Sequence, residues 1–266
     1  MQSAATDLLA LVVLAAVGAV PLALAWRAAR RTHFTWGQAL LMGLNCVYTR
    51  IVWRTTVIGQ FPIAPGQGAI VVSNHRCPLD PAFIGLTVNR MVHWMVAREY
   101  VENPAIGWMF RICRSISVGR AGVDTGATRI ALRYAQSGNL VGIFPEGRIN
   151  TTDDLLLPGR PGAAMIALRA RVPVVPCYIE GSPYDGTAWG CLFMPAKVRL
   201  VIGRPIDLSE FYGREDDREV LKALTKRFLK EIATLAGQPG FEPQLAGRFY
   251  KPGLNGENGE NGNGTP

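Results

Sequence analysis

Histidine is scarce in this sequence, because only three of its 266 residues are histidines. Charged residues are also few, at 18% of the chain against 48% for hydrophobic residues. This composition is more apolar than that of a typical cytosolic enzyme and indicates a membrane-associated protein. Any chemistry based on histidine therefore has few places in this chain.

Several common site motifs are missing. Gly66-Gln67-Gly68 has no third glycine at dinucleotide-binding spacing, and there is neither a Walker phosphate loop nor a Gly-x-Ser-x-Gly elbow. The five cysteines are scattered and form no Cys-x-x-Cys pair, at Cys46, Cys77, Cys113, Cys177 and Cys191. This pattern indicates neither a disulfide framework nor a zinc site. We expect no metal and no cofactor.

The charge that is present is positive, with a net value of +8. A basic protein suits an anionic bilayer surface, phosphorylated substrates or nucleic acid. The arginines are dispersed through an apolar sequence with no nucleic-acid reader motif, so we discount nucleic acid as a partner. Membrane lipids are the partner that composition favours.

The N-terminus predicts a membrane anchor in residues 1–31. Leu8–Trp26 is apolar and long enough for a transmembrane helix, and an arginine cluster follows at residues 27–31. By the positive-inside rule the rest of the chain faces the cytoplasm, which places the protein at the inner membrane. A cleaved signal peptide is the alternative, because Ala23-Leu24-Ala25 resembles a cleavage site. It is disfavoured because a basic n-region is lacking and Asp7 stands there instead.

Residues 32–53 predict an amphipathic helix at the membrane interface. In Trp36–Trp53 an apolar stripe recurs at helical spacing, made by Leu40, Leu44, Val47, Tyr48 and Ile51. An ordinary core helix would show the same periodicity, and only the position after an anchor favours the membrane. At the other end, residues 238–266 are an extension with a Gly/Asn/Glu-rich tail that we expect to be disordered.

Residues 54–237 alternate short β-rich runs with helical stretches. This alternation predicts one α/β domain with a mixed, largely buried sheet flanked by helices. The predicted strands are Thr55–Ile58, Ala69–Ser73, Val92–Ala97, Ser115–Val118, Leu140–Phe144, Val174–Ile179 and Val198–Ile202. The predicted helices are Pro81–Asn89, Pro104–Cys113, Thr125–Gln136, Gly162–Arg171 and Glu215–Leu235.

The first chemical motif places His75 five residues before Asp80, directly after a predicted strand. A loop there can fold back so that the aspartate bonds one ring nitrogen and leaves the other free to take a proton. The plainer interpretation is that Asp80 caps a helix begun by Pro81, with His75 a structural loop residue.

The second motif, Phe144-Pro145-Glu146-Gly147-Arg148, follows another predicted strand. Ligands usually bind at the carboxyl ends of strands in α/β sheets. Arg148 could hold a phosphate with two hydrogen bonds, although a solvated turn is a common alternative. Arg120 likewise follows a predicted strand, and Val172–Cys177 reads as a buried strand that would wall the site.

These four blocks, in this order and spacing, resemble the glycerophospholipid acyltransferase family over about Arg54 to Leu208. The resemblance implies transfer of a fatty acyl group from a thioester, acyl-CoA or acyl carrier protein, to the hydroxyl of a lysophospholipid such as lysophosphatidic acid. It implies that His75 is the general base and Asp80 its orienting partner. It also implies that Arg120, Glu146, Gly147 and Arg148 bind the acceptor.

One departure bears on the acceptor. The commonest family form has threonine after Glu-Gly, whereas here Arg148 follows Gly147 directly. This form looks more like members acting on 2-acyl lysophospholipids such as lysophosphatidylethanolamine, which is an alternative acceptor. A non-enzymatic lipid-binding membrane protein remains a second alternative, and it would need neither His75 nor Asp80.

Overall fold

A computed structural model describes residues 34–119, 124–187 and 190–247, together with residues 8, 11, 18–20, 22–23 and 26–27. Most of the predicted anchor (residues 1–31), the whole Gly/Asn/Glu-rich tail and Arg120 lie outside the described residues. Within the described ranges, no helix is both long and apolar enough to cross a bilayer.

One seven-stranded sheet forms the centre of the molecule, with the strand order β1-β7-β6-β2-β5-β3-β4. Its strands are β1 (Thr56–Ile58), β2 (Ala69–Ser73), β3 (Val92–Ala97), β4 (Ile116–Val118), β5 (Leu140–Ile143), β6 (Val174–Glu180) and β7 (Arg199–Ile202). All neighbouring strands are parallel except β6 and β7, which are antiparallel. The predicted mixed α/β sheet is therefore confirmed.

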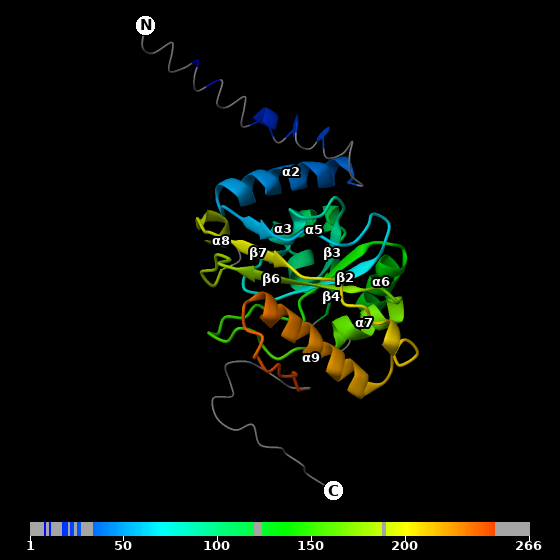
Figure 1. Cartoon of the computed structure of the whole chain (residues 1–266). Helices are drawn as coiled ribbons and strands as arrows, with labels where there is room; N and C mark the ends of the chain where they lie inside the picture. Colours follow the sequence, from blue (N-terminus) through cyan, green and yellow to red (C-terminus); the bar gives the residue numbers. More distant parts are fainter. Residues whose placement is uncertain are drawn as a thin grey trace.

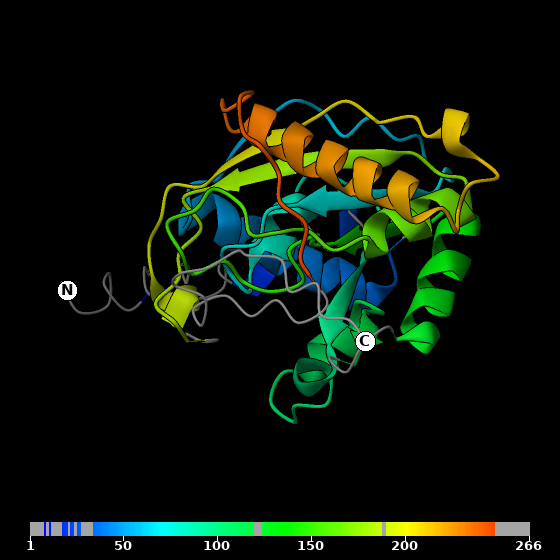
Figure 2. The same cartoon turned by 90° about the horizontal axis from the view of Figure 1, so that it is seen from below.

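Helices cover both faces of this sheet (Figure 1). They are α2 (Trp36–Ile51), α3 (Asp80–Gly85), α4 (Arg98–Val101), α5 (Gly107–Ile112), α6 (Thr125–Gln136), α7 (Gly162–Ala170), α8 (Gly190–Phe193) and α9 (Arg218–Leu235), with a short 3-10 helix at Ser209–Phe211. Figure 2 shows α9 lying across one face. On the opposite face, α2 packs beside α3.

Each face of the sheet has its own hydrophobic core. Successive side chains of a strand point to opposite faces, so Ile70 and Val72 join the core under α6, α7 and α9. Ala69 and Val71 of the same strand join the second core, with Trp53 and Phe83. The central strand β2 is thus buried on both sides and gives the loop that follows it a rigid base.

Helix α2 turns its polar side inward. Gln38 and Thr49 are buried, and the side-chain amide Nε2 of Gln38 donates to the Ile112 carbonyl at 2.9 Å. From the predicted apolar stripe, Leu40 and Leu44 are exposed, as is Ile51 at 69%. These leucine and isoleucine side chains therefore do not pack into the core.

Candidate active site

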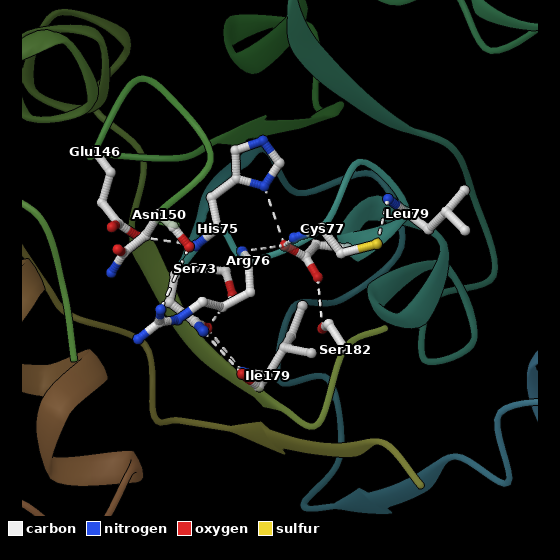
Figure 3. Close-up of polar contacts among 11 residues, drawn as sticks. Ser73, His75, Arg76, Cys77, Leu79, Glu146, Asn150, Ile179 and Ser182 are labelled. Atoms are coloured by element: carbon white, nitrogen blue, oxygen red, sulfur yellow. Dashed lines mark hydrogen bonds and ion pairs between the residues drawn. The ribbon is translucent and has the colours of Figure 1, made fainter. Parts of the chain in front are cut away.

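The predicted histidine and aspartate lie at the carboxyl end of β2 and contact each other. His75 follows β2 by two residues, and its Nδ1 lies 3.0 Å from Oδ2 of Asp80. The His75 side chain is 15% exposed, whereas Asp80 is fully buried. Figure 3 shows the other ring nitrogen pointing away from the carboxylate. The carboxylate thus holds one ring nitrogen and leaves the other outside this contact, which is the arrangement that a general base requires.

Asp80 is fixed by four donors. Its Oδ2 accepts the backbone N–H of Arg76 at 2.7 Å and that of Cys77 at 2.9 Å, besides facing the His75 ring. Its Oδ1 accepts the hydroxyl of Ser182 at 2.7 Å. The carboxylate therefore closes the His75 loop rather than capping α3, whose N-cap position is taken by another residue.

Glu146 supports the same loop from β5. It is 2% exposed, its Oε1 accepts the backbone N–H of His75 at 2.8 Å, and its Oε2 accepts that of Leu157 at 2.8 Å. Burial raises the pKa of the Glu146 carboxyl to about 7, although the two N–H donors and the Arg76 charge oppose the rise. Both oxygens are occupied by the protein's own backbone, so the carboxylate positions the histidine loop.

The guanidinium of Arg76 ties this loop to the segment after Glu146. It donates to the backbone carbonyls of Asn150, Thr152 and Asp154, and the Asn150 N–H donates back to the His75 carbonyl at 2.7 Å. Figure 3 shows Arg76 and Asn150 side by side on one flank of the motif. Two segments that are some seventy residues apart are thereby locked together.

Asn74 joins the loop to β6. Its side-chain amide donates to the Ile179 carbonyl and accepts the Ile179 N–H, both at 2.8 Å. This pair of bonds continues the β2–β6 ladder past the end of β2. Asn74, Arg76 and Ser182 were not among the predicted site residues, because each acts through a partner distant in the sequence.

The remaining predicted site residues lie at the surface or outside the described ranges. Gly147 has φ +70°, a conformation that glycine adopts without strain, and its N–H closes a turn onto the Phe144 carbonyl at 3.0 Å. Arg148 follows it and is exposed. Arg120 belongs to the part of the chain that the structure does not describe.

The neighbouring thiol is not set up as a nucleophile. Cys77 lies two residues after His75 and is fully buried. Burial raises the pKa of the Cys77 thiol well above its usual range, so the thiolate is disfavoured. In the described parts of the chain, no group of three His, Cys, Asp or Glu residues could hold a metal ion.

Comparison with known proteins identifies a family for the part of the chain that contains these residues. The model of the Acyltransferase family matches residues 54–180, which include the histidine loop and the Glu146 turn. Residues 54–180 form an acyltransferase-family domain. This match confirms the family resemblance.

Two relatives are similar to this chain over most of its length, and one of them is a named acyltransferase. The chain is 27% identical over 170 residues to a 1-acyl-sn-glycerol-3-phosphate acyltransferase of Bacillus subtilis, covering 64% of this chain and 81% of the relative. It is also 27% identical over 243 residues to an uncharacterised protein of Mycobacterium tuberculosis, covering 75% of this chain and 65% of that protein. The chain thus spans slightly less than two thirds of the mycobacterial relative.

The acyltransferase domain also has a counterpart among solved structures. The crystal structure of PlsC, the 1-acyl-sn-glycerophosphate acyltransferase of Thermotoga maritima, superposes with a TM-score of 0.57 at 24% identity. The superposition covers 87% of this chain and 98% of the PlsC chain. At this identity the likeness shows a shared fold.

Proposed function

We propose that this acyltransferase-family enzyme moves a fatty acyl group from a thioester, acyl-CoA or acyl carrier protein, to the hydroxyl of a lysophospholipid such as lysophosphatidic acid. The observation that carries the proposal is the His75–Asp80 pair, with 3.0 Å between Nδ1 and Oδ2, inside the acyltransferase domain. The names of the Bacillus and Thermotoga relatives support lysophosphatidic acid as the first acceptor to test.

The chemistry follows from the two ring nitrogens of His75. Donation from Nδ1–H to Asp80 leaves Nε2 with a free lone pair. As the acceptor hydroxyl oxygen bonds to the thioester carbonyl carbon, its proton passes to Nε2. The tetrahedral intermediate then breaks its C–S bond, and the imidazolium returns the proton to the leaving thiolate. The buried Asp80 carboxylate stabilises the imidazolium in between.

Acceptor binding is proposed for the arginines. Arg148 is exposed beside the Gly147 turn, and Arg120 follows β4. A guanidinium binds a phosphate with two parallel hydrogen bonds, which would fix the acceptor hydroxyl near the base. Glu146 and Gly147 contribute to acceptor binding through the shape of the turn, since the Glu146 oxygens already accept backbone N–H groups.

We also propose that the domain lies on a membrane, with the exposed stripe of α2 at the bilayer interface and the domain facing the cytoplasm. Trp36, Leu44 and Ile51 are 67%, 47% and 69% exposed, and Arg50 and Arg54 at the end of the helix are exposed too. An apolar stripe with basic neighbours suits an anionic membrane. Acceptor and acyl chain both favour the bilayer, so this placement brings them to the site.

The activity is tested with membranes containing the full chain. Labelled palmitoyl-CoA and palmitoyl carrier protein are each offered a panel of lysophospholipids that includes lysophosphatidic acid and 2-acyl lysophosphatidylethanolamine. Label in one phospholipid identifies the donor and acceptor. Release of free fatty acid alone would show a hydrolase, and no turnover from either donor would favour the lipid-binding alternative.

The membrane placement is tested by photo-crosslinking. A photoreactive residue replaces Leu44 on the exposed face of α2, and a matched protein carries it at Ile130, an exposed apolar position on α6. We expect labelled phospholipid to be captured at position 44 and not at position 130. Equal capture at both positions would contradict the placement of α2 at the bilayer.

A further inference from the structure

An aromatic stack beneath His75 has no assigned role. The His75 and Phe144 rings lie 3.8 Å apart between centroids and are parallel within 4°. Trp94 stacks on the Phe144 ring with centroids 4.5 Å apart and an angle of 18°. A continuous column of three rings therefore runs from the core of the sheet to the proposed base.

One cross-strand pair makes room for this column of rings. Trp94 of β3 lies opposite Gly142 of β5. A Cβ at position 142 would collide with the Trp94 indole, so only glycine leaves room for the ring there. Phe144 lies two residues beyond Gly142, which brings it to the same side of the strand. Trp94 is 6% exposed and so gives Phe144 a fixed support.

The stack supplies a constraint that Asp80 does not. The hydrogen bond from Nδ1 to Asp80 fixes one edge of the His75 ring, but this bond alone does not fix the tilt of the ring plane. A parallel ring at 3.8 Å fixes the plane, and with it the direction in which Nε2 points. Two contacts together therefore determine the orientation of the base.

The strength of this stacking contact also depends on the charge of the His75 ring. Two neutral aromatic rings prefer an offset or edge-to-face arrangement with centroids 4.5–7 Å apart. The His75–Phe144 pair is closer and almost parallel. The negative face of a phenyl ring attracts a cation, so the Phe144 ring binds an imidazolium more strongly than a neutral imidazole. His75 becomes an imidazolium only as it takes the substrate proton, so this contact strengthens toward the transition state.

We infer that Phe144, supported by Trp94, is a positioning residue that fixes the His75 ring and stabilises its protonated form during acyl transfer. The inference rests on the proposed function, in which His75 is the base. It adds to that proposal a residue acting through the histidine rather than on the substrate.

The test weakens the negative charge on the face of the Phe144 ring in steps while nearly keeping the size of the ring. Mono-, di- and trifluorinated phenylalanine are placed at position 144 of the full chain, alongside Phe144→Leu. The same fluorinated series at Phe83 is the matched control, because Phe83 is a fully buried phenylalanine whose ring meets Trp53 edge-on. Two readouts are taken, kcat and KM for acyl transfer, because a positioning residue should change kcat and leave KM nearly unchanged.

We expect kcat to fall stepwise with fluorination at position 144 while KM stays nearly unchanged. In Phe144→Leu we expect kcat to fall by about three- to tenfold. The Phe83 series should move neither readout. A kcat that stays flat across the fluorinated Phe144 series would overturn the inference, even if Phe144→Leu lowered the melting temperature. Absence of acyl transfer by the unmodified protein would instead contradict the proposed function, on which the inference rests.

Discussion

Two histidines in the described part of the chain stack on aromatic rings, and of these two only His75 has a carboxylate partner. His93 lies in β3 with its Nδ1 3.1 Å from the Arg114 carbonyl, and its ring stacks on Tyr134 with centroids 4.1 Å apart. His75 also stacks on an aromatic ring, but its Nδ1 faces the Asp80 carboxylate. Stacking is common to both, so the carboxylate partner is what distinguishes the two sites.

Position in the sheet makes the second difference. His93 is the second residue of β3 and is 5% exposed, whereas His75 follows the carboxyl end of the parallel strand β2. Burial lowers the pKa of His93, and the nearby Arg114 charge lowers it further. A buried neutral ring at the amino-terminal edge stabilises the fold, while a paired ring at the carboxyl edge can meet a substrate.

Breaking the carboxylate partnership should have the largest effect. Asp80→Asn removes the charge that stabilises the His75 imidazolium, and we expect kcat to fall by about 10²- to 10⁴-fold. Asp217→Asn is the matched control, because Asp217 also accepts backbone N–H groups but at the start of α9. An Asp80→Asn enzyme with nearly unchanged kcat would show that the pair is structural.

A second prediction concerns Glu146, the buried carboxyl group that holds the histidine loop. Its pKa of about 7 lies above the ordinary value of 4.5, so the folded protein binds more protons than the unfolded chain between these values. Stability from this group is present below about pH 4.5 and is lost as the pH rises through about 7. Wild type should therefore lose up to about 3 kcal/mol of unfolding free energy relative to Glu146→Gln between pH 4.5 and 8. Denaturant titrations across this range measure it, and a constant difference would contradict it.

Much of the fold could be predicted because buried parallel strands are continuous apolar runs. The predicted Ala69–Ser73 and Val92–Ala97 coincide with β2 and β3, and the predicted helix Thr125–Gln136 coincides with α6. The last helix was predicted to begin at Glu215 but begins at Arg218, because Asp217 caps it through its side chain. The short helices α4 and α8 were missed, since four residues show no helical period.

Only part of the site could be predicted, because several of its contacts join residues that are far apart in the sequence. His75 and Asp80 share one loop, so their spacing alone suggested a contact. The Ser182 bond to Asp80 spans 102 residues and depends on β6 lying beside β2. The Phe144 stack likewise depends on strand order. For α2, periodicity revealed the apolar stripe but not its division, in which Leu44 and Ile51 are exposed whereas Tyr48 packs against the core.

Removing the Ser182 hydroxyl should lower kcat less than removing the Asp80 charge does. Ser182→Ala removes the donor to Asp80 Oδ1, a hydrogen bond to a charged group, and we expect kcat to fall about five- to tenfold with KM little changed. Ser182→Thr should restore most of the rate. Ser209→Ala is the control, because Ser209 also donates its hydroxyl to an aspartate at 2.7 Å, but on the surface. An unchanged kcat in Ser182→Ala would remove Ser182 from the site.

Replacing His93 should have the smallest effect, and it should change stability rather than activity. Because burial lowers its pKa, the unfolded chain takes up a proton more readily, and stability is lost as the pH falls below the ordinary histidine value of about 6.5. Between pH 7 and pH 5, His93→Gln should lose less unfolding free energy than wild type. This difference should be smaller than the difference expected between wild type and Glu146→Gln. Denaturation at the two pH values measures this, and equal losses would contradict it.

The central claim is that His75, and not His93, is the base. The most direct test compares acyl-transfer rates under single-turnover conditions for His75→Gln and His93→Gln, with the donor and acceptor found for wild type. We predict a loss of about 10²- to 10⁴-fold for His75→Gln and a rate within about threefold of wild type for His93→Gln. Similar losses in both variants, or a nearly unchanged rate in His75→Gln, would contradict the account.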